Sequence, residues 1–273
     1  MKDQENILKQ YAGFLSTPQI FKTTNTLKAK IFQTLEVVDF TEIEGLIHEL
    51  SRQKYLGKRA ELFLLQYLKS SGRYNQITHS LQIRNDSTTL GEVDVICFDN
   101  KRQKWIHIEL VYKLYVFVGE SDYDDFTQWI GPNLKDRLAY KIEKLKSHQL
   151  PLGQHPKILE KIGESQLESY CCYKAKLFLK SPNERLKSDL INDDCLCGHY
   201  INFEEFKTLK YNKTLFYVPE KGDWLCDASE HSRWYNFEKA EATLKPSIKD
   251  KRARLVWQKT FTGEVLEYFV VWW

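Results

Sequence analysis

The stretch "GEVDVICFDNKRQKWIHIELVYK", residues 91–113, constrains the fold more than any other part of the sequence. Two apolar runs flank a polar turn at residues 99–104, a pattern that predicts a β-hairpin. Asp94, Glu109 and Lys113 lie inside those runs, where an ionised group is costly to bury unless it is paired or binds a ligand. A sheet that contains this hairpin must therefore give two carboxylates and an amine a partner or a function.

The alternation of side chains along a strand predicts how these groups meet. Glu109 and Lys113 share one face of their strand, and Asp94 lies on the neighbouring strand, where opposite side chains are about 5 Å apart. Two carboxylates so close repel each other unless a cation lies between them. Mg²⁺ (or Mn²⁺) is the expected cation, since it binds through one or two carboxylates, with waters and phosphate oxygens completing its shell. Lys113 would then orient a water for attack or stabilise the transition state.

Length and composition limit the other interpretations. A chain of 273 residues can form one large core, or one core with a substantial appendage. The formal net charge of +3 is too small to indicate nucleic-acid binding without local clustering. The polar N-terminal sequence lacks a secretory signal and no run approaches the length of a membrane span, so we expect a cytoplasmic protein without membrane contact.

The sequence divides into three expected regions. Residues 1–50 have helical patterning, including "TEIEGLIHEL", in which Thr41 is expected to cap a helix. Residues 51–182 form the expected core, and residues 183–273 form a β-rich region that contains five of the seven tryptophans.

Within the expected core, the patterning alternates between helix and strand. Helical spacing over residues 55–69 is followed by a strand at 75–84, a turn at 85–91 and the hairpin. A second helix is expected between Asn133, as its N-cap, and Pro151, before a strand at 170–180. The order is helix, strand, strand, strand, helix, strand, which predicts an α/β fold with a mixed sheet.

Two groups of basic residues are candidates for binding nucleic-acid phosphates. The first follows helical spacing in the second helix, and the second lies in residues 245–259, where six Lys or Arg accompany one Asp. The candidates are Arg137, Lys141, Lys144, Lys251, Arg252 and Arg254. Solvated helix and sheet faces explain both groups equally well.

The order of elements, with Asp in the second strand and Glu and Lys in the third, resembles the PD-(D/E)XK phosphodiesterase superfamily. The resemblance implies a restriction-endonuclease-like αβββαβ core, in which Asp94 and Glu109 bind Mg²⁺ and Lys113 helps to activate the hydrolytic water. "GKRAE" looks like the G-x-x-x-E of some members, which implies that Glu61 supports the metal. "GEVDVI", "HIELVYKLY", "GPNLKDRLAYKIEKLKSHQLPL" and "TLFYVPEKGDWL" are similar to the domain-of-unknown-function family 1853, an uncharacterised bacterial group.

The sequence departs from the superfamily pattern at one position. The E-x-K spacing would put the lysine at residue 111, which is Val111, and Lys113 lies two residues further along the same face. One hypothesis is therefore a Mg²⁺-dependent phosphodiesterase acting on nucleic acid, with DNA preferred over RNA. The alternative is a catalytically inactive nuclease fold that acts as a nucleic-acid-binding or protein-interaction scaffold.

Overall fold

The computed structural model describes residues 2–34, 43–85, 88–211 and 213–273. These residues form two compact units, each assembled from separate stretches of chain. Unit 1 contains residues 1–18, 113–139 and 175–273, and unit 2 contains residues 19–112 and 140–174. The sequence predicts a different division, into three consecutive segments with boundaries at residues 50 and 182. That division stays a prediction. The expected cap at Thr41 lies outside the described residues.

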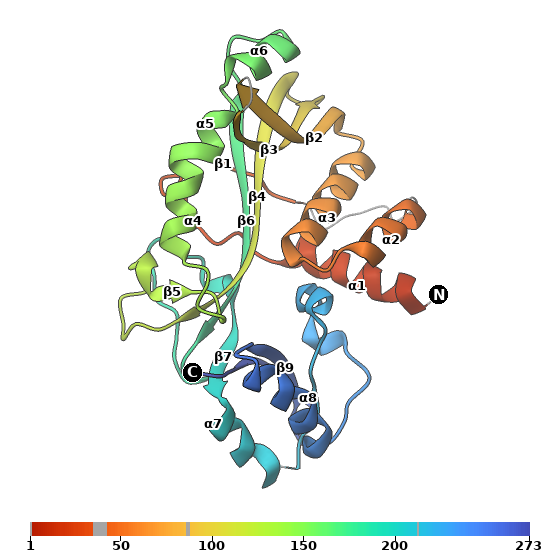
Figure 1. The fold of residues 1–273 in the computed structure, drawn as a ribbon, viewed down its shortest axis with the longest axis vertical. Coiled ribbons are helices and arrows are strands. Elements are labelled where there is room, and N and C mark those ends of the chain that lie inside the picture. Colours follow the sequence, from red (N-terminus) through yellow and green to blue (C-terminus); the bar gives the residue numbers. More distant parts are fainter. Residues whose placement is uncertain (1, 35–42, 86–87, 212) are drawn as a thin grey trace. The chain divides into compact units, whose positions relative to one another are not determined.

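Unit 2 holds most of the expected core. Its strands hydrogen-bond in the order β2-β3-β4-β6. Strand β3 is antiparallel to both β2 and β4, and the short strand β1 is parallel to β6. Helix α3 lies on one side of these strands, and α4 and α5 lie on the other (Figure 1). The elements are β1 (Lys30–Ile31), α2 (Ile43–Arg52), α3 (Leu56–Ser70), β2 (Tyr74–Asn85), β3 (Thr88–Asp99), β4 (Lys104–Phe117), α4 (Leu138–Lys144), a π turn (Leu145–Gln149), α5 (Leu150–Leu152), α6 (Pro156–Ile162) and β6 (Glu168–Leu179). Strands β4 and β6 continue into unit 1.

Helix α3 follows the predicted apolar spacing. Ala60, Phe63, Leu64 and Leu68 are completely buried and form its inner face. An amphipathic face of this kind is stabilised mainly by packing against the sheet rather than by intrinsic helix propensity. The prediction of a helix over 55–69 is therefore confirmed.

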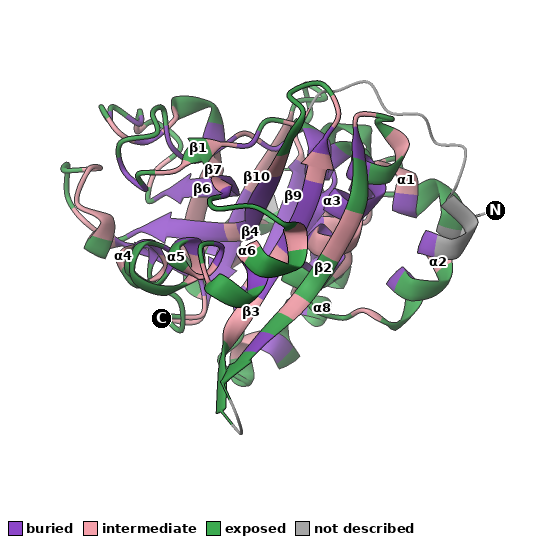
Figure 2. Ribbon diagram, turned by 90° about the horizontal axis from the view of Figure 1, so that it is seen from above, coloured by how far each residue is buried: buried purple, intermediate pink, exposed green. Residues whose placement is uncertain are grey.

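The hairpin of β3 and β4 has the predicted turn, since Asp99 pairs with Lys104. Strand β4 is buried on both faces over most of its length, as Figure 2 shows, because helices cover the sheet on both sides. A central strand buried on both faces consists mainly of apolar residues. Glu109 is an exception in this strand, and it is completely buried.

Three details of the prediction are corrected. Residues Thr88–Gly91 belong to β3 rather than to a turn, consistent with the β preference of the two threonines. Helix α4 begins at Leu138, and Asn133 instead accepts a hydrogen bond from the backbone N–H of Ala253. Pro151 does not end the helical segment, because it lies in the first turn of α5, where its missing N–H is not needed.

Unit 1 contains a second group of strands, in the order β7-β10-β9-β8. Strand β10 is parallel to β7 and antiparallel to β9, which in turn is antiparallel to β8. The elements are α1 (Lys2–Ser16), β5 (Trp129–Ile130), β7 (Leu196–Asn202), α7 (Phe203–Thr208), β8 (Leu215–Tyr217), α8 (Phe237–Lys249), β9 (Arg254–Lys259) and β10 (Val265–Val271), with short 3-10 helices that include η5 (Lys221–Leu225) and η6 (Ala228–Glu230).

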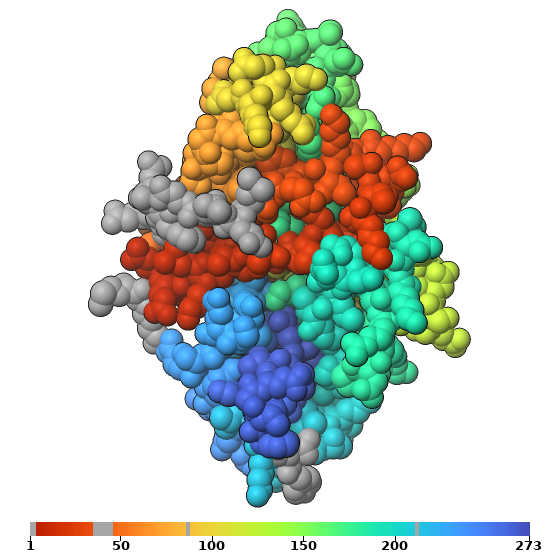
Figure 3. Space-filling model, turned by 180° about the vertical axis from the view of Figure 1, so that it is seen from behind, coloured from red at the N-terminus to blue at the C-terminus, as the bar shows by residue number. Residues whose placement is uncertain are grey.

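An aromatic core joins the helices and strands of unit 1. Phe206 of α7, Phe216 of β8 and Phe237 of α8 contact one another, with ring centroids 5.1–6.0 Å apart. Helix α1 lies against the segment that carries η5 (Figure 3). Residues 183–273 contain the four strands β7 to β10, in agreement with the expected β-rich region, and the 13-residue helix α8 is an addition to them.

The fold as a whole belongs to the predicted α/β class, with parallel and antiparallel strand pairs and several helices. Among the described residues, no helix combines the length and the apolar character needed to cross a bilayer.

Candidate metal and catalytic site

The register of the hairpin brings Asp94 and Glu109 together. Val95 pairs with Ile108 across the two strands, so the next residues toward the open end are Asp94 and Glu109. Glu109 Oε1 lies 3.4 Å from the backbone nitrogen of Asp94, and the N–H of Leu110 donates to Asp94 Oδ2 at 2.8 Å. The two carboxylates therefore belong to one site in unit 2.

Glu109 is held by two side chains as well as by burial. His107 Nε2 lies 2.8 Å from Glu109 Oε1, and Gln149 Nε2 donates to Glu109 Oε2 at 2.6 Å. The other ring nitrogen of His107, Nδ1, lies 3.1 Å from the hydroxyl of Ser169. These contacts fix the orientation of Glu109 and compensate for its complete removal from water.

Lys141 joins this network through Gln149. Lys141 Nζ donates to Gln149 Oε1 at 2.7 Å, so a chain of hydrogen bonds runs from the ammonium through the amide to Glu109. In an uninterrupted α-helix, two residues eight apart would lie about 80° apart around the axis. The π turn at Leu145–Gln149 widens the helix between them, and π turns are frequent at functional sites.

The electrostatics of the site favour an added or neighbouring cation. Burial, followed by the negative charges of Glu109 and Glu61, raises the pKa of Asp94 to about 7. The N–H of Leu110 and the charge of Lys141 act in the opposite direction, because both stabilise the carboxylate. Burial lowers the pKa of Lys141, and the two carboxylates partly offset that effect.

Glu61 contributes to the site from α3. Its carboxylate pairs with Lys58 one turn away at 2.6 Å, and Lys58 also lies 3.7 Å from Glu92 of β3. Glu61 therefore acts on Asp94 through its charge while its own partner is Lys58.

Lys113 has a different environment from the one expected. It lies in unit 1, where its Nζ pairs with Asp136 at 2.8 Å. The charge of Lys141 acts on the pKa of Asp94, and Lys58 of α3 also interacts electrostatically with Asp94. The catalytic assignment of Lys113 stays a prediction, and Lys141 is a second candidate for the same role.

The six candidate phosphate-binding residues have separate environments. In unit 2, Lys141 is engaged with Gln149, whereas Lys144 is exposed. In unit 1, Arg254 donates to the carbonyl of Pro219 at 3.1 Å, and Arg252 forms an ion pair with Asp250. Lys251 lies over the ring of Trp272, and Arg137 is exposed just before α4.

An open groove of about 650 Å³ leads to Asp94. Gly91, Glu92 and Asp94 of β3 form one side, and the π turn and α5 form the other. Lys144, Ser147, His148 and His155 also line the groove. Its polar lining can donate hydrogen bonds to an anionic ligand that approaches the carboxylates.

The carboxylate pair suits Mg²⁺ better than it suits a metal that is held entirely by protein side chains. Within the described part of the chain, no group of three or more His, Cys, Asp or Glu side chains is arranged to hold a metal. Two carboxylates suffice for Mg²⁺, which keeps several waters and takes other ligands from a substrate phosphate. Asp94 Oδ1 has no hydrogen-bond partner among the residues that the structure describes, so it is available to a cation.

Sequence reasoning missed the roles of Gln149 and Lys141 beside the carboxylates. Gln149 is 40 residues from Glu109, and Lys141 was grouped with the basic helix face. His107 and Glu109 are two residues apart in β4, and the alternation of a strand puts both side chains on the same side, where they contact each other.

Comparison with known proteins identifies the family of the chain. The model of the family described as "Domain of unknown function (DUF1853)" matches residues 7–271, so the chain belongs to this family. No curated protein and no solved structure gives a significant match.

Proposed function

For this member of the DUF1853 family, we propose a metal-dependent phosphodiesterase that hydrolyses nucleic acid, on a core of the PD-(D/E)XK type. The observation that carries the proposal is the pairing of the half-buried Asp94 with the completely buried Glu109 on adjoining strands, with Lys141 beside it and an open groove leading to Asp94. The order of α3, β2, β3, β4, α4 and β6 supports the proposed core.

Each residue has a proposed role in the reaction. Asp94 and Glu109 hold Mg²⁺ or Mn²⁺, and the charge of Glu61 supports them. A bound Mg²⁺ supplies a Lewis acid that polarises the phosphoryl oxygens and lowers the pKa of a bound water. Lys141, held by Gln149, stabilises negative charge that develops on the phosphate. His107 and Gln149 keep the Glu109 carboxylate in one orientation.

The nucleic acid is proposed to reach the site through the groove. Lys144 and the polar groove residues would contact backbone phosphates near Asp94. The basic residues of the other unit, Lys251, Arg252 and Arg254 among them, are proposed as further phosphate contacts. DNA is the preferred substrate in this proposal.

A nuclease assay on purified protein tests the proposal. Single-stranded DNA, double-stranded DNA and RNA are incubated with Mg²⁺ or Mn²⁺, with and without EDTA. We expect metal-dependent cleavage that falls by about 100-fold or more in Asp94→Asn and in Glu109→Gln. Equal activity in wild type and in both variants would refute it. Glu264→Gln, an exposed carboxylate in unit 1, is the control for an unrelated loss of charge.

Two lysine variants decide which amine acts in the reaction. If Lys141 stabilises the transition state, Lys141→Met should lose about 10²–10³-fold in rate. Lys113→Met should then retain the activity of the wild type. The opposite result would assign the role to Lys113 and leave Lys141 as a structural partner of Gln149.

One observation favours the non-catalytic alternative. Both oxygens of Glu109 already accept or share hydrogen bonds from His107 and Gln149, and Lys141 supplies a positive charge without a metal. A scaffold of this kind would bind nucleic acid in a salt-dependent manner that EDTA does not change. Binding without cleavage in the assay above would support it.

A further inference from the structure

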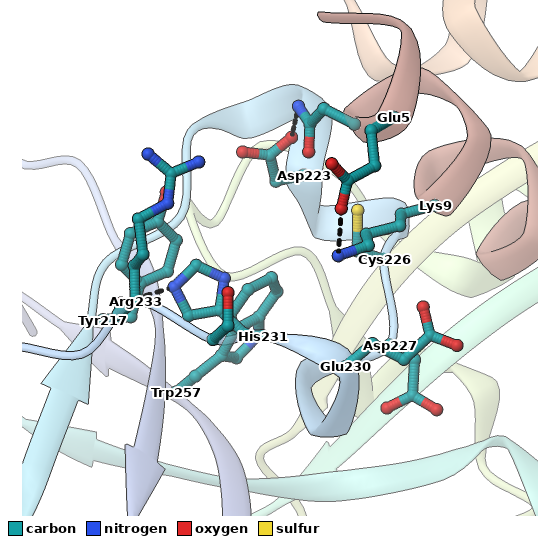
Figure 4. A pocket seen from close by; sticks show the side chains of 12 residues that line it. Glu5, Lys9, Tyr217, Asp223, Cys226, Asp227, Glu230, His231, Arg233 and Trp257 are labelled. Atoms are coloured by element: carbon teal, nitrogen blue, oxygen red, sulfur yellow. Dashed lines mark hydrogen bonds and ion pairs between the residues drawn. The ribbon is translucent and has the colours of Figure 1, made fainter. Parts of the chain in front are cut away.

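A small pocket in unit 1 is unrelated to the carboxylate pair. It lies among α1, β8, β9, η5 and η6, and its volume is about 190 Å³ (Figure 4). Since a water molecule occupies about 30 Å³ in the liquid, the pocket has space for roughly six waters or one small organic group.

Three rings form one wall of the pocket. The ring centroids of Tyr217 and His231 are 3.7 Å apart, and those of Tyr217 and Trp257 are 5.5 Å apart with an angle of 30° between the planes. His231 lies 5.2 Å from Trp257. Aromatic faces carry negative electrostatic potential, so they attract a cation that lies against them.

His231 contributes a hydrogen-bond acceptor. Its Nε2 lies 2.6 Å from the carbonyl oxygen of Arg233, and because a carbonyl only accepts, Nε2 must carry the proton. Burial lowers the pKa of His231, which favours the neutral ring. Nδ1 of the neutral ring is then an acceptor, and it has no partner among the residues described in the structure.

The charges around the pocket are predominantly negative. Four carboxylates line it, Glu5, Asp223, Asp227 and Glu230, against the two cations Lys9 and Arg233, which leaves a net charge of −2. Lys9 is already paired with Glu5 at 3.2 Å, so it does not neutralise the other three acids. Asp223 accepts hydrogen bonds from Asn6 and Gln10, which keep it at the junction of α1 and η5.

We propose that this pocket binds one guanidinium group, which lies against the half-buried ring of Tyr217 and donates to His231 Nδ1 and the carboxylates. A guanidinium is planar, always charged and rich in donors, and it stacks on aromatic faces, so it matches a wall of rings with acceptors around it. The negative charge disfavours a nucleotide phosphate. The group comes either from a free small guanidine or from an arginine side chain of a bound protein.

Calorimetric titration of the full chain tests this proposal with two probes. Agmatine represents a free guanidine, and an acetylated Gly-Arg-Gly amide represents an arginine side chain. The matched control replaces arginine by citrulline, which keeps the shape and removes the charge. We expect saturable binding of at least one guanidinium probe and at least tenfold weaker binding of the citrulline peptide. Binding of the peptide alone would identify a protein partner as the source.

Two variants connect the binding to the pocket. His231→Phe keeps a ring but removes the acceptor, and Glu230→Gln removes one negative charge from the rim. Each should weaken guanidinium binding several-fold, whereas Glu264→Gln, outside the pocket, should not. Circular dichroism spectra of all variants check that they remain folded.

Two results would overturn the proposal. One is the absence of saturable binding by either guanidinium probe. The other is equal affinity of the wild type for the arginine and citrulline peptides, a comparison that does not depend on any variant being folded.

Discussion

Replacing Asp94 with asparagine should stabilise the protein, and the gain should grow as the pH rises. The pKa of Asp94 is raised from 3.8 to about 7, chiefly by burial and then by the charge of Glu109. An acid with a raised pKa in the folded state binds a proton more tightly there than in the unfolded chain. Ionisation of Asp94 therefore opposes folding progressively as the pH rises from about 4 to about 7.

The magnitude follows from the difference in pKa. Each unit of pKa corresponds to about 1.4 kcal/mol, so the free-energy penalty reaches about 2 kcal/mol at pH 5 and about 4 kcal/mol at pH 8. Asparagine cannot ionise, and its carbonyl can still accept from the N–H of Leu110. The gain in the free energy of unfolding should thus be larger at pH 8 than at pH 5 by about 2–3 kcal/mol.

Urea unfolding of wild type and Asp94→Asn at the two pH values measures this difference, with tryptophan fluorescence and circular dichroism as parallel probes. Glu92→Gln is the matched control, since it removes a carboxylate from the same strand at a half-exposed position. An Asp94→Asn gain that is equal at both pH values, or a loss at both, would refute the account of a partly desolvated Asp94 beside the buried Glu109.

Further predictions concern packing, ion pairing and metal binding. Gly153→Ala should cost about 1–3 kcal/mol in urea unfolding, because its Cβ would lie 2.2 Å from His107 Nδ1, whereas Gly57→Ala, with open space around it, should stabilise by about 0.5–1 kcal/mol. Asp99→Asn should cost about 1.5–3 kcal/mol near neutral pH, since Asp99 accepts from Arg73 Nε at 2.9 Å. The pKa of Asp99 is lowered, so its stabilising effect is present above pH 3.8 and is lost as the pH falls further. Urea unfolding in acid should therefore show the free energies of unfolding of the wild type and Asp99→Asn converging. At pH 8, Mg²⁺ or Mn²⁺ at 100 times its dissociation constant should raise the free energy of unfolding of the wild type by about 2.7 kcal/mol, and EDTA should reverse the effect; no shift in the unfolding midpoint would exclude the proposed metal site.

The sequence predicted the elements whose periodicity is strong. Helix α3 and strands β2 and β6 lie within one or two residues of the expected ranges. Helical spacing predicts α3, alternation predicts β2, and a mainly apolar run predicts β6. The turn of the hairpin at Asp99 was also predicted, since polar residues separate two apolar runs there.

The parts that were not predicted depend on contacts distant in sequence. Asn133 has the residue type of a helix cap, yet its side chain bonds to Ala253, 120 residues away. Lys141 has the spacing of a solvated helix face, yet the π turn and Gln149 connect it to the buried Glu109. Local spacing contains no information about either partner, because both contacts are set by tertiary packing.

The discontinuous make-up of unit 1 has a consequence for biosynthesis. Its first element, α1, packs on η5 through Asn6 and Gln10, and its last strand ends at Val271. Helix α1 ends at Ser16 and η5 ends at Leu225, so 209 residues, 225 minus 16, are synthesised between the helix and its partner. At about 5–20 residues per second, the nascent helix would remain without its partner for roughly 10–40 s. During that interval the apolar side chains of α1, such as Tyr11 and Phe14, are a target for chaperones.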